Sequence, residues 1–294
     1  MHLTNSNGLE CLVYVNGFFV KDSEAQISLL DRGFTLGDGI FETMVASKSK
    51  VANFDKHMDR LGYGGEILHI RTPEPDRIGE ILSESICRNG FDYSVVRLTL
   101  TRGTDFLRGL EVHSNVEPSI VVRTTPWSGP LASMPDGVRL ISSPILRNNF
   151  SPLSGVKSLG YADAVLARHE SKLSGADDAL IFNVNHKMTG ASSSNIFLVM
   201  AGKLVTPPVS DGILPGVARS SILSLASDLS IPILEESVTK IHLEYCQEVF
   251  LSNVVTGIVP VVSIDGVTFM SGSAGIMTNK LFGQYWDSIR ANLS

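Results

Sequence analysis

Strand-like and helix-like segments follow one another along almost the entire chain. In the clearest strand, at residues 95–101, Val96, Leu98 and Leu100 alternate with polar residues, so one face is apolar. In the clearest helix, at residues 78–86, apolar residues recur at helical spacing until Gly90 ends the pattern. Strands interleaved with helices predict an α/β or α+β fold.

Weaker patterns extend this interpretation to both ends of the chain. Residues 11–20 predict a hairpin that turns at Asn16-Gly17, and Asp55 is expected to cap a helix that carries Met58 and Leu61. The segment around Gly33, Gly37 and Gly39 is expected to be a packed surface loop. Further strands are expected near 40–46, 51–54, 138–144, 179–183, 196–200, 203–206 and 248–264, and further helices at 161–173, after Gly216, and at the end, where Phe282, Trp286 and Ile289 share a face.

The 294 residues suffice for two domains. The best linker candidate is the segment 124–137, which holds three prolines and two glycines. We therefore predict an N-terminal domain at 1–123, this linker, and a C-terminal domain at 138–294.

Composition excludes several functional classes. The net charge of -6 argues against a nucleic-acid partner. The three cysteines have no metal-ligand spacing, so we expect no metal site and a reducing, cytoplasmic location. No signal peptide is evident, and the most apolar segment, 249–264, is too interrupted to span a membrane.

Lys157 is the candidate for covalent chemistry. It lies between a Pro/Gly/Ser-rich approach and a helix, and a lysine can form an imine with an aldehyde cofactor. The helix start after Pro215-Gly216 exposes backbone N–H groups that suit a phosphate. Arg60 is either a solvated residue beside an apolar stripe or an anion clamp. These residues alone support a lysine-dependent enzyme and nothing more specific.

Several short motifs together resemble the fold-type IV (class IV) pyridoxal-phosphate enzymes, from about Tyr14 to Gly266. That family contains branched-chain aminotransferases, D-amino-acid aminotransferases and 4-amino-4-deoxychorismate lyases. No single motif is specific, but their order and spacing are. They are Val15-Asn16-Gly17, Leu30-Asp31-Arg32-Gly33-Phe34, Gly37-Asp38-Gly39-Ile40-Phe41-Glu42, His57-Met58-Asp59-Arg60-Leu61, Lys157-Ser158-Leu159, Leu166-Ala167-Arg168, Ser194-Asn195-Ile196-Phe197, Leu214-Pro215-Gly216 and Pro260-Val261.

The resemblance implies a two-domain fold, with a smaller N-terminal α/β domain and a larger C-terminal α/β pseudo-barrel. It implies pyridoxal 5'-phosphate as the cofactor, bound covalently by Lys157, which also moves the substrate proton. The other cofactor contacts implied are Arg60, Tyr161, Gly190, Ser192, Val217, Ala218, Asn253, Val254 and Val255. The substrate contacts implied are Tyr14, Phe41, and Arg97 or Arg108 for a carboxylate. The family also implies a homodimer whose active sites lie at the subunit interface.

One position departs from the family pattern. Gly190 stands where the family carries a glutamate that keeps the pyridine nitrogen protonated. Another group compensates, the reaction depends less on the protonated ring, or the change weakens the enzyme. The sequence leaves these alternatives open.

We expect an aminotransferase that moves an amino group from an amino acid, with branched-chain types favoured, to a 2-oxo acid by a ping-pong cycle. Arg108-Gly109-Leu110 lacks the histidine typical of D-amino-acid enzymes. The alternatives are a 4-amino-4-deoxychorismate lyase, which eliminates pyruvate, and a catalytically weakened cofactor-binding homologue.

Overall fold

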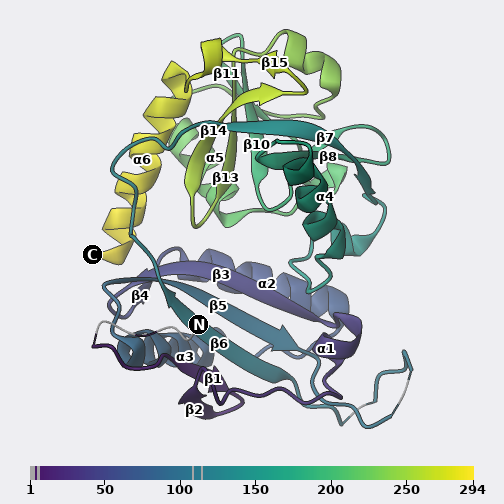
Figure 1. The fold of residues 1–294 in the computed structure, drawn as a ribbon, viewed down its shortest axis with the longest axis vertical. Coiled ribbons are helices and arrows are strands. Elements are labelled where there is room, and N and C mark those ends of the chain that lie inside the picture. The colour runs from purple at the N-terminus through teal and green to yellow at the C-terminus, as the bar shows by residue number, and fades with distance from the viewer. Residues whose placement is uncertain (1–3, 5–6, 108, 114) are drawn as a thin grey trace. The chain divides into compact units, whose positions relative to one another are not determined.

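A computed structural model describes residues 4, 7–107, 109–113 and 115–294, and its fold mixes helices with two sheets (Figure 1). Contacts divide the chain into two compact units. The first comprises Met1–Pro130, Val156–Gly160 and Ile289–Ser294; the second comprises Leu131–Gly155 and Tyr161–Ser288. The linker predicted at 124–137 stays a prediction; within it, residues 127–137 belong to no helix or strand.

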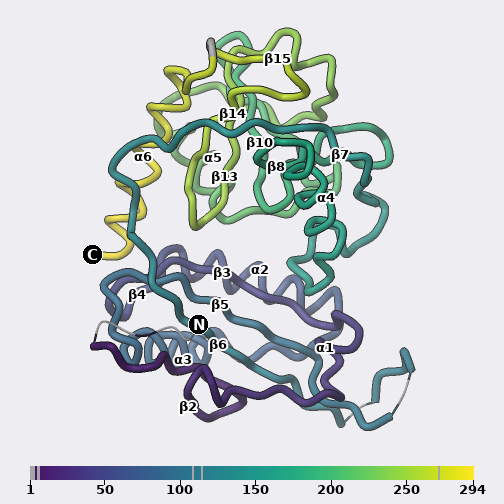
Figure 2. The backbone as a smooth tube through the Cα atoms, in the orientation of Figure 1, coloured from purple at the N-terminus to yellow at the C-terminus, as the bar shows by residue number. Residues whose placement is uncertain are grey.

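The first unit is built on a six-stranded antiparallel sheet with the strand order β2-β1-β6-β5-β3-β4. The predicted hairpin is confirmed, and its strand β1 runs beside β6 (Figure 2). The strands are β1 (Leu12–Val15), β2 (Phe18–Lys21), β3 (Gly39–Ser47), β4 (Lys50–Val51), β5 (Tyr93–Thr101) and β6 (Ser119–Pro126). The helices are α1 (Arg32–Leu36), α2 (Phe54–Leu68) and α3 (Pro75–Asn89).

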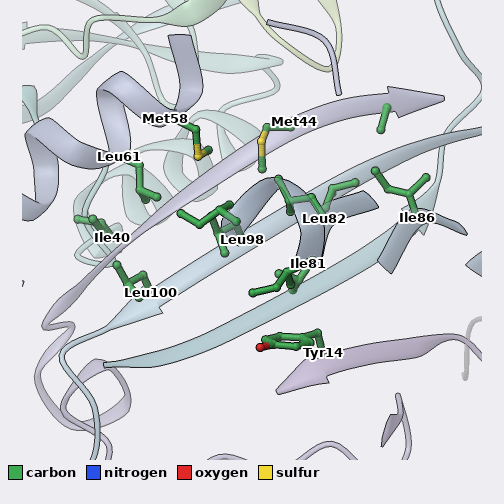
Figure 3. Close-up of a cluster of buried hydrophobic side chains, with 14 of the residues drawn as sticks. Tyr14, Ile40, Met44, Met58, Leu61, Ile81, Leu82, Ile86, Leu98 and Leu100 are labelled. Atoms are coloured by element: carbon green, nitrogen blue, oxygen red, sulfur yellow. The ribbon is translucent and has the colours of Figure 1, made fainter. Parts of the chain in front are cut away.

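Helices α2 and α3 cover one face of this sheet, and their apolar stripes form its core with the strands (Figure 3). Met58 and Leu61 of α2 pack there, with Leu82 of α3 and Leu98 of β5. The alternation predicted for β5 and the helix ending at Gly90 are confirmed. Burying one face this way fixes which side chains remain on the other.

Three local predictions in this unit were wrong. The strand expected at 51–54 is only the two-residue β4, because α2 already begins at Phe54. Asp55 does not cap α2; the helix begins at Phe54 after Asn53, and Asp55 lies in the first turn, where a negative charge favours the helix dipole. The glycine-rich segment is not a plain loop. Asp31 caps the short helix α1 by accepting from the Gly33 N–H, and Gly37 ends it in the left-handed conformation.

The second unit contains a nine-stranded sheet with the order β12-β11-β10-β13-β14-β7-β8-β9, and β15 pairs with β14. β9 ends this order, yet a turn of three residues joins it to β10, so the sheet curls back on itself as a half-barrel. Its strands are β7 (Val138–Arg147), β8 (Asp178–Asn183), β9 (Met188–Ala191), β10 (Asn195–Met200), β11 (Lys203–Thr206), β12 (Ile233–Glu235), β13 (Glu248–Asn253), β14 (Gly257–Ile264) and β15 (Val267–Thr268).

The helices in this half of the chain are α4 (Ala162–Leu173), α5 (Val217–Asp228) and α6 (Ile276–Leu293), whose last residues, from Ile289, belong to the first unit. Short 3-10 turns occupy Pro152–Gly155, Val209–Asp211, Lys240–Glu244 and Met270–Gly272. α4 packs on β7 and β8, and α5 packs on β12 and β13. The predicted buried face of the last helix is confirmed, since Phe282, Trp286 and Ile289 are all buried. Among the described residues, no helix is both long and apolar enough to span a bilayer.

Candidate active site

Lys157 is held at the edge of the first unit's sheet by backbone pairing. The Phe41 N–H donates to the Lys157 carbonyl and the Leu159 N–H donates to the Gly39 carbonyl, both at 2.9 Å. Val156, next to the lysine, is buried in the apolar core. The segment 156–160 thus extends the sheet beside the start of β3, and the backbone at Lys157 is fixed.

The side chains of Lys157 and Arg97 share one aromatic ring. Lys157 Nζ lies 4.3 Å from the centroid of the Phe41 ring, and Arg97 Cζ lies 3.7 Å from it. Cations over an aromatic face are attracted by the ring quadrupole. Two positive groups on one buried ring create a place that favours an anion, such as a carboxylate.

Arg60 is tied to a buried carboxylate on the helix-covered face of the sheet. Its Nε donates to Glu42 Oε1 at 2.7 Å and its Nη2 to Glu42 Oε2 at 2.5 Å. His57 Nδ1 lies 2.7 Å from the same Oε2. Glu42 is 0% exposed and His57 1%. The side-on pairing directs the third guanidinium nitrogen, Nη1, away from Glu42.

Burial and charge decide the protonation of this group. Burial acts to raise the pKa of Glu42, but the hydrogen bonds from Arg60 and His57 outweigh it and hold that pKa below its usual value. Burial lowers the pKa of His57, and the charges of Arg60 and Lys157 act in the same direction. A neutral imidazole therefore donates from Nδ1 to an ionised carboxylate.

The pKa of His57 is lower in the folded protein than the 6.5 expected in the unfolded chain. The free energy of unfolding should therefore be unaffected by His57 above pH 6.5 and should fall as the pH drops below it. The unfolded chain then binds a proton that the folded chain refuses, with a slope of at most about 1.4 kcal/mol per pH unit. Urea unfolding at several pH values measures this, and His57→Asn, which keeps a donor near Nδ1, should flatten the slope between pH 6.5 and 5. The carboxylates Glu42 and Asp38 do not contribute in this range, because their pKa values lie below the ordinary carboxylate values. An unchanged slope in the variant would therefore contradict the role of His57.

Glu42 and His57 stand in the family motifs given above, but no role was predicted for either residue. One signal was present: Glu42 is the single charged residue of a strand that is otherwise small, apolar or hydroxylated, which marks a buried charge that needs a partner. Arg102, which directly follows β5, the strand of Arg97, has a structural role. It binds Asp38 at 2.7 Å and the carbonyls of Leu68 and His69.

In the second unit, α5 begins without a side-chain cap. Gly216 is the N-cap residue, and the first helical turn contains Val217 and Ala218, both buried. The first backbone N–H groups of a helix have no carbonyl partner within it, and they carry the positive end of the dipole. The helix start therefore has the backbone geometry of an anion site.

A tight turn in the same unit holds the other predicted backbone donors. Asn253 Oδ1 accepts from the Val255 N–H at 3.0 Å and from the Thr256 N–H at 2.9 Å. Val254 lies inside this turn, between β13 and β14. The turn follows β13, and α5 packs on β13. The turn and the helix start therefore belong to neighbouring elements of the second unit.

The backbone at Gly190 excludes a side chain. Its φ is +128°, and a Cβ there would lie 2.4 Å from the carbonyl oxygen of Ser194. An L-residue at 190 would need the β9–β10 turn to move. Ser192, buried in that turn, lies 3.4 Å from Arg168 Nη1. Tyr161 is the N-cap residue of α4 and is partly buried.

One predicted substrate residue, Tyr14, lies apart from Lys157. Tyr14 is in the core on β1, three strands from β3, or about 14 Å at the usual strand spacing. It also lines a cavity of about 560 Å³ with Asn16, Asn115 and Ile120. Arg108 lies outside the described residues, and both roles stay predictions. No cluster of three His, Cys, Asp or Glu side chains suited to a metal occurs in the part of the chain that the structure describes.

The chain is similar to known proteins in both sequence and fold. Residues 39–264 match the sequence model of the family described as amino-transferase class IV. A Methanocaldococcus jannaschii protein assigned as a branched-chain-amino-acid aminotransferase is 32% identical over 94% of this chain and 95% of its own length.

Two solved structures have the same fold and a sequence identity close to 30%. A branched-chain aminotransferase from Thermoproteus uzoniensis, solved with norvaline, has a TM-score of 0.87 and 28% identity over 96% of this chain and 97% of its own. A Legionella pneumophila protein assigned as a 4-amino-4-deoxychorismate lyase has a TM-score of 0.83 and 30% identity, over 91% of this chain and 97% of its own.

Proposed function

This chain belongs to the class IV aminotransferase family, and from that premise we propose that it moves an amino group between branched-chain-type amino acids and 2-oxo acids. The family is pyridoxal-phosphate dependent, and its fold is the mixed α+β fold described above. The branched-chain preference is supported by the Methanocaldococcus and Thermoproteus relatives, whose assigned activity is of that kind.

The residues present fit pyridoxal phosphate. A lysine amine fixed over an aromatic ring suits the aldehyde, and a buried arginine held by a carboxylate suits the phosphate. The start of α5 offers backbone N–H groups to a phosphate, and Val254 lies in the 253–256 turn, which ends the β13 strand on which α5 packs. We assign the cofactor to Lys157, Arg60, Val217, Ala218 and Asn253–Val255, with Tyr161 and Ser192 beside the ring.

When bound, the cofactor's ring withdraws electrons from the substrate's Cα, which makes the proton there acidic. The Lys157 amine takes that proton from Cα as a general base. It then gives a proton to the cofactor carbon C4′ as a general acid. Arg97 on the Phe41 ring orients the substrate carboxylate. The buried Phe41 ring lies beneath the amine and gives it an apolar neighbour.

The observation that carries this proposal is the placement of Lys157 on the edge of β3, over Phe41 and beside Arg97. The test is a panel of amino donors with 2-oxoglutarate as the acceptor, followed by glutamate production. We expect leucine, isoleucine and valine to be used best and D-alanine poorly. Transfer from D-alanine alone would overturn the substrate class.

A lyase is the second candidate, favoured by the Legionella relative and its 30% identity. A 4-amino-4-deoxychorismate lyase releases pyruvate without passing an amino group to a 2-oxo acid. Incubation with aminodeoxychorismate and coupling to lactate dehydrogenase separates the two activities. Rapid pyruvate release with no glutamate formed from any donor would replace the aminotransferase assignment.

Gly190 bears on the third alternative, a weakened homologue. We expect Gly190→Glu to lower the free energy of unfolding by about 1–3 kcal/mol, because the backbone conformation and the Ser194 carbonyl oppose a side chain there. Amino transfer should not rise. Denaturant unfolding measures the loss, and Gly283→Glu, at an open position on α6, is the matched control. A stable and more active Gly190→Glu enzyme would mean that the turn relaxes and the ring nitrogen gains a carboxylate.

We also propose a cytoplasmic homodimer. Phe34, Phe106 and Leu110 are 70%, 82% and 82% exposed in the first unit. Arg32, two residues before Phe34, donates to the carbonyls of Gly109 and Glu111, on either side of Leu110, and so holds these two segments together. Exposed apolar patches of this kind mark protein interfaces. The cysteines Cys11, Cys87 and Cys246 are free, in keeping with a reducing compartment. Sedimentation of the purified protein tests the dimer; a monomer at micromolar concentration would contradict it.

A further inference from the structure

We propose that Ser194 and Asn195 are positioning residues, which hold the two backbone segments that bind the cofactor's phosphate. The inference rests on the proposed function, because it takes the start of α5 and the 253–256 turn as the phosphate site. Neither residue needs to touch the cofactor. Each acts through the segment to which it is bonded.

Asn195 braces the entry to α5. It is buried at the start of β10, and its Nδ2 donates to the Leu214 carbonyl at 2.9 Å. Its Oδ1 lies against Gly216, where a Cβ would come within 2.0 Å of it. The amide therefore fixes the residue two before the N-cap by a hydrogen bond, and fixes the N-cap itself by contact. The direction of the first helical N–H groups follows from both.

Ser194 braces the other segment. Its Oγ accepts from Asn253 Nδ2 at 3.0 Å, and the opposite atom of that amide, Oδ1, accepts from the N–H groups of Val255 and Thr256. One asparagine side chain thus links the β9–β10 turn to the 253–256 turn. Without Ser194, the Asn253 amide would keep its backbone bonds but lose the partner that sets its orientation.

The turn that carries both braces is itself rigid. The Ala191 N–H donates to the Ser194 carbonyl at 2.9 Å, and Asn195 pairs in register with Ser252 of β13. The same Ser194 carbonyl occupies the place of a side chain at Gly190. The small residues at 190–194 therefore allow a tight turn from which Ser194 and Asn195 hold two phosphate-binding segments.

The test compares two cofactor forms on the full-length protein after removal of bound cofactor. Pyridoxal phosphate and pyridoxal, which lacks the phosphate, are titrated while the absorbance of the lysine-bound form is followed. We expect Asn195→Ala to raise the Kd for pyridoxal phosphate about tenfold and Ser194→Ala about fivefold, the scale of one hydrogen bond. The Kd for pyridoxal should change less than about twofold.

Ser193→Ala is the matched control, because Ser193 is exposed in the same turn. It should leave both dissociation constants within about twofold of the wild-type values. The ³¹P resonance of the bound phosphate should shift in Asn195→Ala and stay in place in the control. Equal losses for pyridoxal phosphate and pyridoxal, or no loss for either, would overturn the positioning role.

A double-mutant cycle checks the contact at Gly216. Gly216→Ala alone should lower phosphate-dependent binding more than Asn195→Ala does, because the new Cβ would overlap Oδ1. In the Asn195→Ala background that overlap is absent, so adding Gly216→Ala should cost much less. Additive effects would reject the contact.

The two proposals fail in different ways. If neither cofactor form gives a lysine-bound absorbance band with the wild-type protein, the proposed function is wrong. If the band forms normally and the Asn195 and Ser194 variants retain full preference for the phosphorylated form, only the positioning role is wrong.

Discussion

Replacing Lys157 by alanine is expected to reduce amino transfer by at least about a thousandfold, the scale of a lost general base, with loss of covalent cofactor attachment in addition. The reason is positional: the backbone at 157 is paired with β3, and its ammonium lies over Phe41. Steady-state transfer to 2-oxoglutarate measures the loss.

Two companion variants sharpen this result. Lys157→Arg keeps a cation over Phe41, but a guanidinium stays protonated and is no nucleophile, so we expect the same loss. Lys203→Ala, at an exposed position of β11, should leave activity unchanged. Borohydride should fix the cofactor to Lys157 in the wild-type protein. Fixation at another lysine, or substantial turnover in both position-157 variants, would contradict the assignment.

The largest effect on stability is expected at Glu42. Glu42→Ala removes the carboxylate that faces the buried Arg60 guanidinium and the His57 imidazole, and breaking such a group costs about 3–5 kcal/mol. Unfolding in urea, monitored by circular dichroism, measures the change in the free energy of unfolding.

Glu84→Ala is the matched control for that measurement. Glu84 also pairs with an arginine, Arg88, but on the exposed face of α3, where such pairs contribute about 0.5 kcal/mol or less. The same chemical change should therefore have effects that differ by several kcal/mol. Losses within about 1 kcal/mol of each other would show that the Glu42 group is not held as the distances indicate.

Local patterns in the sequence predicted the elements that depend on local forces. The hairpin at Asn16-Gly17, the alternation of β5 and the helix that ends at Gly90 each follow from a turn signal or a repeat within a few residues. The short strand β9 was missed, because Met188–Ala191 has no alternation and gains its strand conformation by pairing with β8.

The site was predictable only where family motifs marked it. Lys157 and Arg60 stand in such motifs, and the structure places both in the first unit. The pairing of residues 156–160 with β3 had no local signal, because it joins segments far apart in the chain. The contact between Asn195 and Gly216 also had no local signal, since it joins the start of β10 to the N-cap of α5, two segments that are separate in the sequence.

The pairing of the lysine segment with β3 has a consequence for synthesis on the ribosome. The nascent chain completes β3 long before residue 156 is made, and at about 5–20 residues per second the delay is roughly 6 to 23 s. During that time the edge of Gly39–Phe41 is open to other strands, a known route to aggregation. Translation pauses between codons 41 and 156 should therefore lower the soluble yield, whereas a chaperone that shields strand edges should restore it.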